Sequence, residues 1–194
     1  MVIAADAGAD QVLRCGRIAD VVIGDFDSIS EETLKVHDQT HQIDDQEGTD
    51  VDKLFGYLER KAFGSVTIVG AEGDLPDHFL ATVHSAAKSG LDVSFGFRRG
   101  MGWIIRGGAP RSLFLPLGRR FSLLPIAGGH LESLTGVQWP LTNVSLSPLG
   151  QTSISNVVMG DRVEVDLRSG VALAFAEFSE GEMPRWEDSH EVNG

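Results

Sequence analysis

Short apolar runs alternate with helix-like segments over the first hundred residues of the chain. Four runs, each ended by glycine or small polar residues, predict buried strands at residues 2–5, 21–23, 66–69 and 91–95. Helices are predicted over residues 10–15 and 77–89, and after the candidate N-cap residues Ser30 and Thr49 or Asp50. Strands that alternate with helices indicate an α/β domain with a mainly parallel sheet.

The pattern changes near residue 100. Beyond it, glycine and proline break up short strand-like runs, and helical periodicity is absent from the sequence. The runs lie at residues 103–106, 112–115, 120–124, 144–147, 162–167 and 171–178. This pattern predicts an antiparallel, all-β sandwich domain. We therefore expect an α/β domain at 1–99, a β-sandwich at 100–180 and a frayed polar tail at 181–194.

Composition and charge narrow the class of protein. The chain has 194 residues, a single cysteine and a formal net charge of −12. It contains neither a membrane-length apolar run nor a basic signal-like start, so we expect a cytoplasmic protein without a membrane partner. The acidic balance argues against binding to a nucleic-acid backbone, which requires clustered lysine and arginine.

The acidity is concentrated in one stretch of the chain. Residues 20–52 contain 11 acidic residues and one basic residue, Lys35. Such a stretch is compatible with a solvated surface or with a carboxylate cluster that binds a cation. The positions of the acids relative to the predicted strands distinguish the two interpretations.

Acidic residues follow three of the expected strands. Asp6 comes directly after the first strand, Asp25 and Asp27 after the second, and Glu72 shortly after the third. In open parallel sheets, ligands bind beyond the carboxyl ends of the strands, so these acids are expected to share one crevice. Mg²⁺ prefers oxygen ligands and often combines one or two carboxylates with substrate phosphates. This edge of the sheet is therefore a predicted magnesium site.

A second acidic stretch leads into a lysine. Asp50 lies at the start of a predicted helix, and Lys53, three residues later, lies on the same face. An ammonium group beside carboxylates suits a site that must neutralise a polyphosphate. Taken singly, each signal is also typical of helix caps and exposed ion pairs.

Several motifs, taken in chain order, resemble the thiamine pyrophosphokinase family. In the first half they are Asp6-Ala7-Gly8-Ala9, Gly24-Asp25-Phe26-Asp27-Ser28-Ile29, Asp45-Gln46, Thr49-Asp50-x-x-Lys53, and Gly70-Ala71-x-Gly73 with Asp77-His78. In the second half they are Gly136-Val137-Gln138-Trp139-Pro140-Leu141, Ser153-Ile154-Ser155-Asn156, and Ser169-Gly170, which matches the family's final hairpin. The combination runs through nearly the whole chain and is specific, whereas any one motif alone is not.

The resemblance implies a homodimer with an α/β domain and a β-sandwich. It implies transfer of the pyrophosphoryl group of ATP to the hydroxyethyl oxygen of thiamine, which gives thiamine diphosphate and AMP. Mg²⁺ is implied at Asp6, Asp25, Asp27 and Asp50, and the catalytic candidates are Asp27, Asp50 and Lys53. Asp50 is a candidate both for a metal ligand and for the group that accepts the hydroxyl proton. The nucleotide-binding candidates are Gly8, Gln46, Thr49, Lys53, Gly70, Gly73 and Asp77.

The resemblance places thiamine on the second domain. The candidates are Trp139, Ser153, Ser155 and Asn156. Thiamine is a cation, so the Trp139 indole is suited to stack on it. A core position for Trp139 and a simple turn at Ser155 and Asn156 are the alternatives.

The chain departs from the family pattern at several places. Asp10 stands where the family has a neutral amide, and Leu75 stands where it has a phosphate-facing arginine. Thr82 replaces an asparagine. The family's first strand and helix are also absent, so the chain is expected to be either truncated before Met1 or built on a shorter sheet.

Two other functions compete with this interpretation. A related pyrophosphokinase with another acceptor, such as a hydroxymethylpterin, would share the acidic residues of the first domain. A degenerate, non-catalytic protein that binds thiamine or a nucleotide is favoured by the missing arginine and the missing first strand. The Ser153–Asn156 segment favours thiamine over another acceptor.

Overall fold

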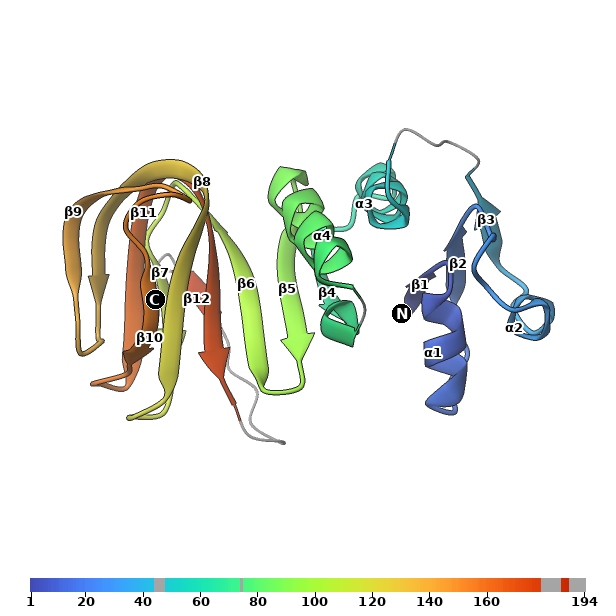
Figure 1. The fold of residues 1–194 in the computed structure, drawn as a ribbon, viewed down its shortest axis with the longest axis horizontal. Helices are drawn as coiled ribbons and strands as arrows, with labels where there is room; N and C mark the ends of the chain where they lie inside the picture. The colour runs from blue at the N-terminus through green and yellow to red at the C-terminus, as the bar shows by residue number, and fades with distance from the viewer. Residues whose placement is uncertain (44–47, 74, 179–185, 189–194) are drawn as a thin grey trace, which may run out of the picture. The chain divides into compact units, whose positions relative to one another are not determined.

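The computed structural model describes residues 1–43, 48–73, 75–178 and, for the backbone alone, 186–188. It divides into two compact units (Figure 1). Unit 1 comprises Met1–Gly64 and Glu72–Leu91, and unit 2 comprises Ser65–Ala71 and Asp92–Gly194.

Among its described residues, unit 1 contains a small parallel sheet and four α-helices. Its strands, in the order β1-β2-β3, are β1 (Ile3–Ala5), β2 (Val21–Gly24) and β3 (Thr40–Gln42). The helices are α1 (Gly8–Arg14), α2 (Glu31–Lys35), α3 (Asp50–Arg60) and α4 (Pro76–Lys88). The strands and helices predicted for this part of the sequence are confirmed, whereas β3 was not predicted.

Local side-chain chemistry fixes two of the helix starts. The Ser30 hydroxyl accepts a hydrogen bond from the amide of Thr33 at 3.2 Å and begins α2. Thr49 begins α3 through a capping box, in which its hydroxyl and its amide both bond to Asp52. The cap of α3 brings Asp50 and Lys53 into the first turn of the helix.

Unit 2 is built on a mixed sheet of nine strands within the described residues. These are β4 (Ser65–Val69), β5 (Asp92–Phe97), β6 (Gly100–Arg106), β7 (Arg111–Phe114), β8 (Arg120–Thr135), β9 (Leu141–Leu146), β10 (Ser153–Val157), β11 (Arg162–Glu177) and β12 (Trp186–Asp188). Strands β4 and β5 are parallel, and β5 pairs with β6 in the antiparallel sense. The two strands expected at 66–69 and 91–95 therefore extend the β-rich sheet and do not join β1 and β2.

This pairing changes the division of the chain. The short connection between β5 and β6 pairs Phe97 with Gly100, so the sheet continues across the boundary expected between residues 99 and 100. The compact units separate instead at Gly64, at Ala71 and at Leu91. The hydrophobic pattern located β4 and β5, but it does not encode which neighbour each strand will pair with.

Two long, bent strands, β8 and β11, each pair with different neighbours at their two ends and so connect two parts of the sheet in unit 2 (Figure 1). Residues 162–165 of β11 pair with β7, and residues 171–177 pair with β6. Strand β8 divides its partners in the same way, between β10 near its start and β9 near its end. Buried residues from both halves form one core, which includes Phe121, Leu131, Val163 and Ala174.

A bend in β11 replaces two expected features. The two runs predicted at 162–167 and 171–178 form one strand, and the register shifts between Asp166 and Ala172. Ser169 and Gly170 lie in this irregular part of the strand and not in a hairpin. Gly170 has φ +90°, and a Cβ atom there would lie 2.7 Å from the carbonyl oxygen of Gly128. Glycine therefore permits both the bend and the close approach of β8.

The polar tail expected at 181–194 is wrong for its central residues. Trp186–Asp188 form β12, which pairs with β7 in an antiparallel register from Trp186↔Leu113 to Asp188↔Arg111. An edge strand offers unpaired backbone groups to any extended segment, so three residues pair there despite their polar surroundings in the sequence.

Candidate active site

Asp6 is the buried acid of unit 1. It follows β1 with φ 40°, and its amide donates a hydrogen bond to the carbonyl of Ile23 at 2.8 Å. Only 3% of the residue is exposed. Its Oδ2 accepts from the amide of Ser28 at 3.3 Å, whereas its buried Oδ1 has no hydrogen-bond partner among the described residues. A buried acceptor without a partner is costly, and it marks a position where a ligand would be favoured.

Two further carboxylates approach Asp6. Asp25 follows β2, and Asp50 is the first residue of α3. Each of the three residues offers one oxygen that lies within 4.8 Å of the others. The prediction that the acids after the strands converge is thus met in part, by Asp6 and Asp25, and α3 supplies Asp50. Glu72, which was expected in the same crevice, lies in the 3₁₀ turn after β4 and is not in this group.

Lys53 is the positive charge of this cluster. Its Nζ donates to Asp25 Oδ2 at 2.9 Å and to Asp50 Oδ1 at 3.0 Å. The Lys53 side chain is only 6% exposed, whereas about a third of each partner side chain remains exposed. The contact with Asp50 agrees with the spacing in the sequence, and the contact with Asp25 joins α3 to the end of β2.

The electrostatic environment shifts the pKa values of Asp6 and Asp25 in opposite directions. Burial raises the pKa of the Asp6 carboxyl above its ordinary value, and the charge of Asp50 raises it further. The hydrogen bond from Lys53 lowers the pKa of Asp25, and the same bond raises the pKa of Lys53. The Lys53–Asp25 pair is therefore charged at neutral pH, beside a carboxylate that is costly to ionise.

This donor set fits a hard divalent cation such as Mg²⁺. Three carboxylates of different elements supply oxygen atoms, which this ion prefers, and their mutual repulsion is relieved when a cation is bound. The unpartnered Oδ1 of Asp6 is the observation specific to this chain, because exposed acids gather without a metal in many proteins.

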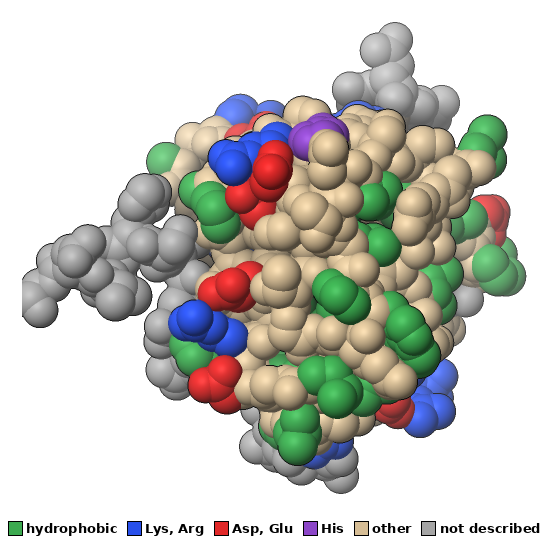
Figure 2. All heavy atoms as spheres, turned by 90° about the vertical axis from the view of Figure 1, so that its left-hand side faces the viewer, with side chains coloured by type: hydrophobic (Ala, Val, Ile, Leu, Met, Phe, Trp, Pro, Cys, Tyr) green, Lys and Arg blue, Asp and Glu red, His purple; other side chains and the backbone are tan. Residues whose placement is uncertain are grey.

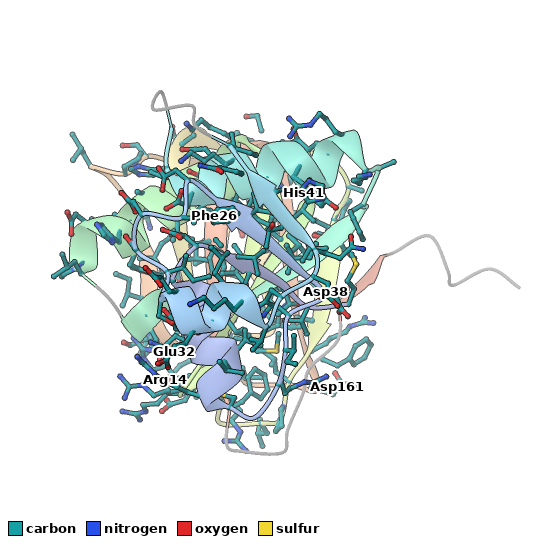
Figure 3. All side chains as sticks on the ribbon, turned by 90° about the vertical axis from the view of Figure 1, so that its right-hand side faces the viewer. Arg14, Phe26, Glu32, Asp38, His41 and Asp161 are labelled. Carbon is teal, nitrogen blue, oxygen red and sulfur yellow. The ribbon has the colours of Figure 1, made fainter. Side chains whose placement is uncertain are left out.

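Asp27 lies outside this three-carboxylate group. Its Oδ1 accepts from the Ser28 hydroxyl at 2.7 Å, and its amide lies 3.4 Å from Asp25 Oδ1. Between the two acids, Phe26 has φ 67°, which turns the chain sharply after β2. In Figure 3, Phe26 lies above Arg14, the last residue of α1, and apart from it. The role of Asp27 as a metal ligand stays a prediction.

The other nucleotide-binding candidates of unit 1 have varied settings. Thr49 uses its hydroxyl in the capping box of α3, and Gly8 begins α1. Asp77 lies in the first turn of α4, and Gly73 ends the short 3₁₀ helix η1 (Ala71–Gly73). Gln46, with its neighbour Asp45, lies outside the described residues.

Gly70 belongs to unit 2. It follows β4 with φ +84°, a conformation that favours glycine.

In unit 2, Asn156 holds the segment that carries Trp139. Its Nδ2 donates to the Trp139 carbonyl at 2.8 Å and to Ser153 Oγ at 3.0 Å. Its Oδ1 accepts from the amides of Trp139 at 3.0 Å and Val157 at 2.9 Å. All four hydrogen-bonding capacities of the amide are thus used inside the chain, and the residue is 2% exposed.

The Trp139 residue is 56% exposed, so the alternative of a core position is wrong. Ser155 has φ 57°, and its hydroxyl accepts from Arg120 Nε at 3.0 Å. Sequence reasoning missed Arg120, whose guanidinium also lies over the ring of Phe175. It missed Ser28 as well, whose amide bonds to Asp6. Both contacts join residues more than 20 positions apart, which no local motif indicates.

Comparison with known families decides the affiliation of the chain. Residues 1–94 match the model of the thiamin pyrophosphokinase catalytic domain. Residues 114–172 match the model of the thiamin pyrophosphokinase vitamin B1 binding domain. Together the two matches take in more than three quarters of the chain. The chain belongs to the thiamin pyrophosphokinase family.

Solved structures of thiamin pyrophosphokinases share the fold. The thiamine pyrophosphokinase from Bacillus subtilis is 22% identical, with a TM-score of 0.77 over 91% of this chain and 87% of that one. The enzyme from Candida albicans is 15% identical, with a TM-score of 0.75 over 91% and 82%. The yeast enzyme is 16% identical, with a TM-score of 0.70 over 91% and 78%. No curated protein matches the chain significantly.

The structure accounts for one departure from the thiamin pyrophosphokinase pattern. The Asp10 carboxylate accepts from the Ser30 hydroxyl at 2.7 Å and from the Ser30 amide at 3.2 Å. Hydrogen bonds from Thr33 and Ser30 lower the pKa of Asp10. The extra charge therefore ties α1 to the start of α2, and Asp10 is not a member of the three-carboxylate group.

A second departure from the family pattern removes a positive charge. Leu75, where the family has an arginine, is the exposed N-cap residue of α4 and supplies no charge.

Among the residues that the structure describes, no helix combines the length and the apolar character that crossing a membrane requires.

Proposed function

We propose that this thiamin pyrophosphokinase transfers the pyrophosphoryl group of ATP to thiamine, with Mg²⁺ held by Asp6, Asp25 and Asp50. The observation that carries the proposal is the buried, unpartnered Oδ1 of Asp6 within a group of three carboxylates. Family membership supports the activity, and the donor set supports a divalent cation.

The reaction requires attack on the β-phosphorus of ATP. The hydroxyethyl oxygen of thiamine forms a bond to this phosphorus, and the bond from phosphorus to the oxygen shared with the α-phosphate breaks. AMP leaves, and the hydroxyl proton passes to a carboxylate base. Bound Mg²⁺ supplies charge neutralisation on the phosphate oxygens.

The chain's own residues prepare this step. Asp25 and Asp50 are candidates for metal ligands, and Asp50 is also a candidate for the base, since its side chain is partly exposed. Lys53 is proposed to contact the transferred phosphates. Asp27, which is exposed and close in sequence to Asp25, is proposed as an additional metal ligand. Gly8, Gln46, Thr49, Gly70, Gly73 and Asp77 remain the proposed nucleotide contacts.

Thiamine is proposed to bind to unit 2. The exposed Trp139 indole suits a cation–π contact with the thiazolium ring. Ser155 is a proposed hydrogen-bonding partner, and Ser153 is already bonded to Asn156. Because the Asn156 amide has no free capacity, we propose that it contributes by fixing the backbone of Trp139.

The expected homodimer and cytoplasmic location are also proposals. Exposed hydrophobic residues on unit 2 support an interface, among them Leu117, Leu149 and Met159. Figure 2 shows hydrophobic side chains gathered on one face, with acidic and basic side chains beside them. The single, exposed and unpaired Cys15 is compatible with a reducing compartment.

An acceptor comparison tests the proposed function. The protein is incubated with Mg-ATP and, separately, with thiamine or a hydroxymethylpterin, and the products are separated chromatographically. The proposal predicts thiamine diphosphate and AMP, and no pyrophosphorylated pterin. Absence of thiamine diphosphate while thiamine still binds would favour a degenerate binding protein, and pterin turnover would favour the related pyrophosphokinase.

A further inference from the structure

Lys53 bonds to two of the three carboxylates that would hold a divalent cation. Its ammonium donates hydrogen bonds to Asp25 Oδ2 at 2.9 Å and to Asp50 Oδ1 at 3.0 Å. These two residues, with Asp6, form the three-carboxylate group of unit 1. A metal that binds to Asp25 and Asp50 through these oxygens must therefore compete with the ammonium.

The ammonium group of Lys53 is bound by protein carboxylates and is largely shielded from solvent. Its side chain is 6% exposed, and its Nζ bonds to residues of two different elements, the end of β2 and the start of α3. Without Lys53, three carboxylates would repel one another across less than 5 Å. The lysine thus supplies the counter-charge that the group requires.

The Asp6 carboxylate is not satisfied by this arrangement. Lys53 bonds to Asp25 and Asp50, while Asp6 Oδ1 stays buried without a partner among the described residues. One ammonium therefore neutralises the group only in part. A divalent cation that arrives with a polyphosphate brings more positive charge for the acids and offers the ammonium a new anionic partner.

We propose that Lys53 is a placeholder cation, which holds Asp25 and Asp50 together in the ligand-free protein and moves to phosphate when the metal–nucleotide complex binds. The proposal rests on the metal site of the proposed function. It implies that the protein binds free divalent metal weakly, because the metal must displace the ammonium without offering it phosphate. Removal of the lysine charge then strengthens the binding of metal alone.

Binding of Mn²⁺ to the nucleotide-free protein tests this directly, with electron paramagnetic resonance as the readout. Lys53→Met is expected to bind Mn²⁺ at least about tenfold more tightly than the wild type, because it removes a unit charge within hydrogen-bond distance of the ligands. Lys53→Arg keeps the charge and is expected to bind as weakly as the wild type.

Lys88→Met is the matched control. It removes the same charge from the same unit, but Lys88 is 74% exposed and lies 3.8 Å from Asp52, a residue outside the three-carboxylate group. Solvent and salt screen such an exposed charge, so the affinity of Lys88→Met for Mn²⁺ is expected to equal that of the wild type.

The outcomes separate the two levels of the proposal. Equal Mn²⁺ affinities for the wild type and Lys53→Met would overturn the placeholder role and leave the metal site standing. Absence of binding to either protein would overturn both. If Lys53→Met fails to fold, acylation of lysines in the wild type replaces it: saturating Mn²⁺ is expected to speed modification of Lys53 relative to Lys88, and an unchanged ratio overturns the proposal.

Discussion

The amide side chain of Asn156 binds the backbone of Trp139 in both directions. Nδ2 donates to the Trp139 carbonyl at 2.8 Å, and Oδ1 accepts from the Trp139 amide at 3.0 Å. The buried asparagine thereby fixes a residue whose indole is mostly exposed. This relationship divides the segment into a structural part, Asn156, and a part that is free to contact a ligand, Trp139.

Asn156→Ala is expected to destabilise the protein by about 2–4 kcal/mol, because it removes four hydrogen bonds made by the side chain of a residue that is 2% exposed. Urea-induced unfolding measures the change. Ser155→Ala is the control, since the Ser155 hydroxyl bonds to the exposed Arg120 guanidinium, and it is expected to stay within about 0.5 kcal/mol of the wild type. Equal midpoints for Asn156→Ala and the wild type would contradict the structural role.

Trp139→Ala should have the opposite profile. Its free energy of unfolding is expected to change little, because the side chain is exposed, whereas the KM for thiamine is expected to rise about tenfold through loss of the cation–π contact. Ile154→Ala, at an equally exposed position of β10, serves as the matched control for steady-state kinetics. A KM that changes equally in both variants would remove Trp139 from the thiamine site.

The charge of Asp6 is expected to lower the stability of the folded protein, although the proposed metal site requires this carboxylate. Because burial and neighbouring acids raise its pKa in the folded state, ionised Asp6 lowers stability once the pH exceeds the unfolded value near 3.8. Asp6→Asn keeps an acceptor for the Ser28 amide and removes the charge. In metal-free buffer it is expected to be more stable than the wild type at pH 7, and this difference is expected to shrink as the pH falls through the raised folded-state pKa of Asp6 toward 3.8. Thermal unfolding from pH 3 to 8 measures this, and a difference independent of pH would refute it.

The ionised carboxylate of Asp25 has the opposite effect and stabilises the folded protein. Its pKa is lowered by Lys53, so the stabilisation that it provides is present above pH 3.8 and is lost as the pH falls through its folded-state pKa.

Asp27→Asn is expected to abolish turnover and to leave the free energy of unfolding within about 0.5 kcal/mol, because Asp27 is exposed and lies outside the three-carboxylate group. Turnover is measured with Mg-ATP and thiamine, and stability with urea. Full activity in this variant would exclude Asp27 from the metal site.

Much of unit 1 could be predicted because its signals are local. Ser30 and Thr49 cap helices through bonds to residues three positions away, and such patterns are visible in sequence. The convergence of Asp6 and Asp25 followed from the rule for strand ends. Strand β3 could not be found, since Thr40–Gln42 are polar and exposed and lack the apolar pattern of a strand, while their pairing with β2 joins residues 18 positions apart.

Long-range pairing accounts for the other differences. The sequence placed Lys53 beside Asp50, but the bond to Asp25 spans 28 residues and depends on where α3 lies against β2. Similarly, Asn156 appeared as a ligand candidate within a short motif. Its two bonds to Trp139 span 17 residues and depend on how β10 lies beside the segment after residue 136.

The most direct test of the central claim is the product stoichiometry of the metal-dependent reaction. Phosphorus NMR follows Mg-ATP and thiamine with the wild type, with Asp50→Asn, and with the wild type in excess chelator. We predict equal amounts of thiamine diphosphate and AMP from the wild type, and a loss of at least about a hundredfold in rate in the other two samples. Formation of ADP in place of AMP, or unchanged turnover in Asp50→Asn and in chelator, would contradict a pyrophosphokinase centred on Asp6, Asp25 and Asp50.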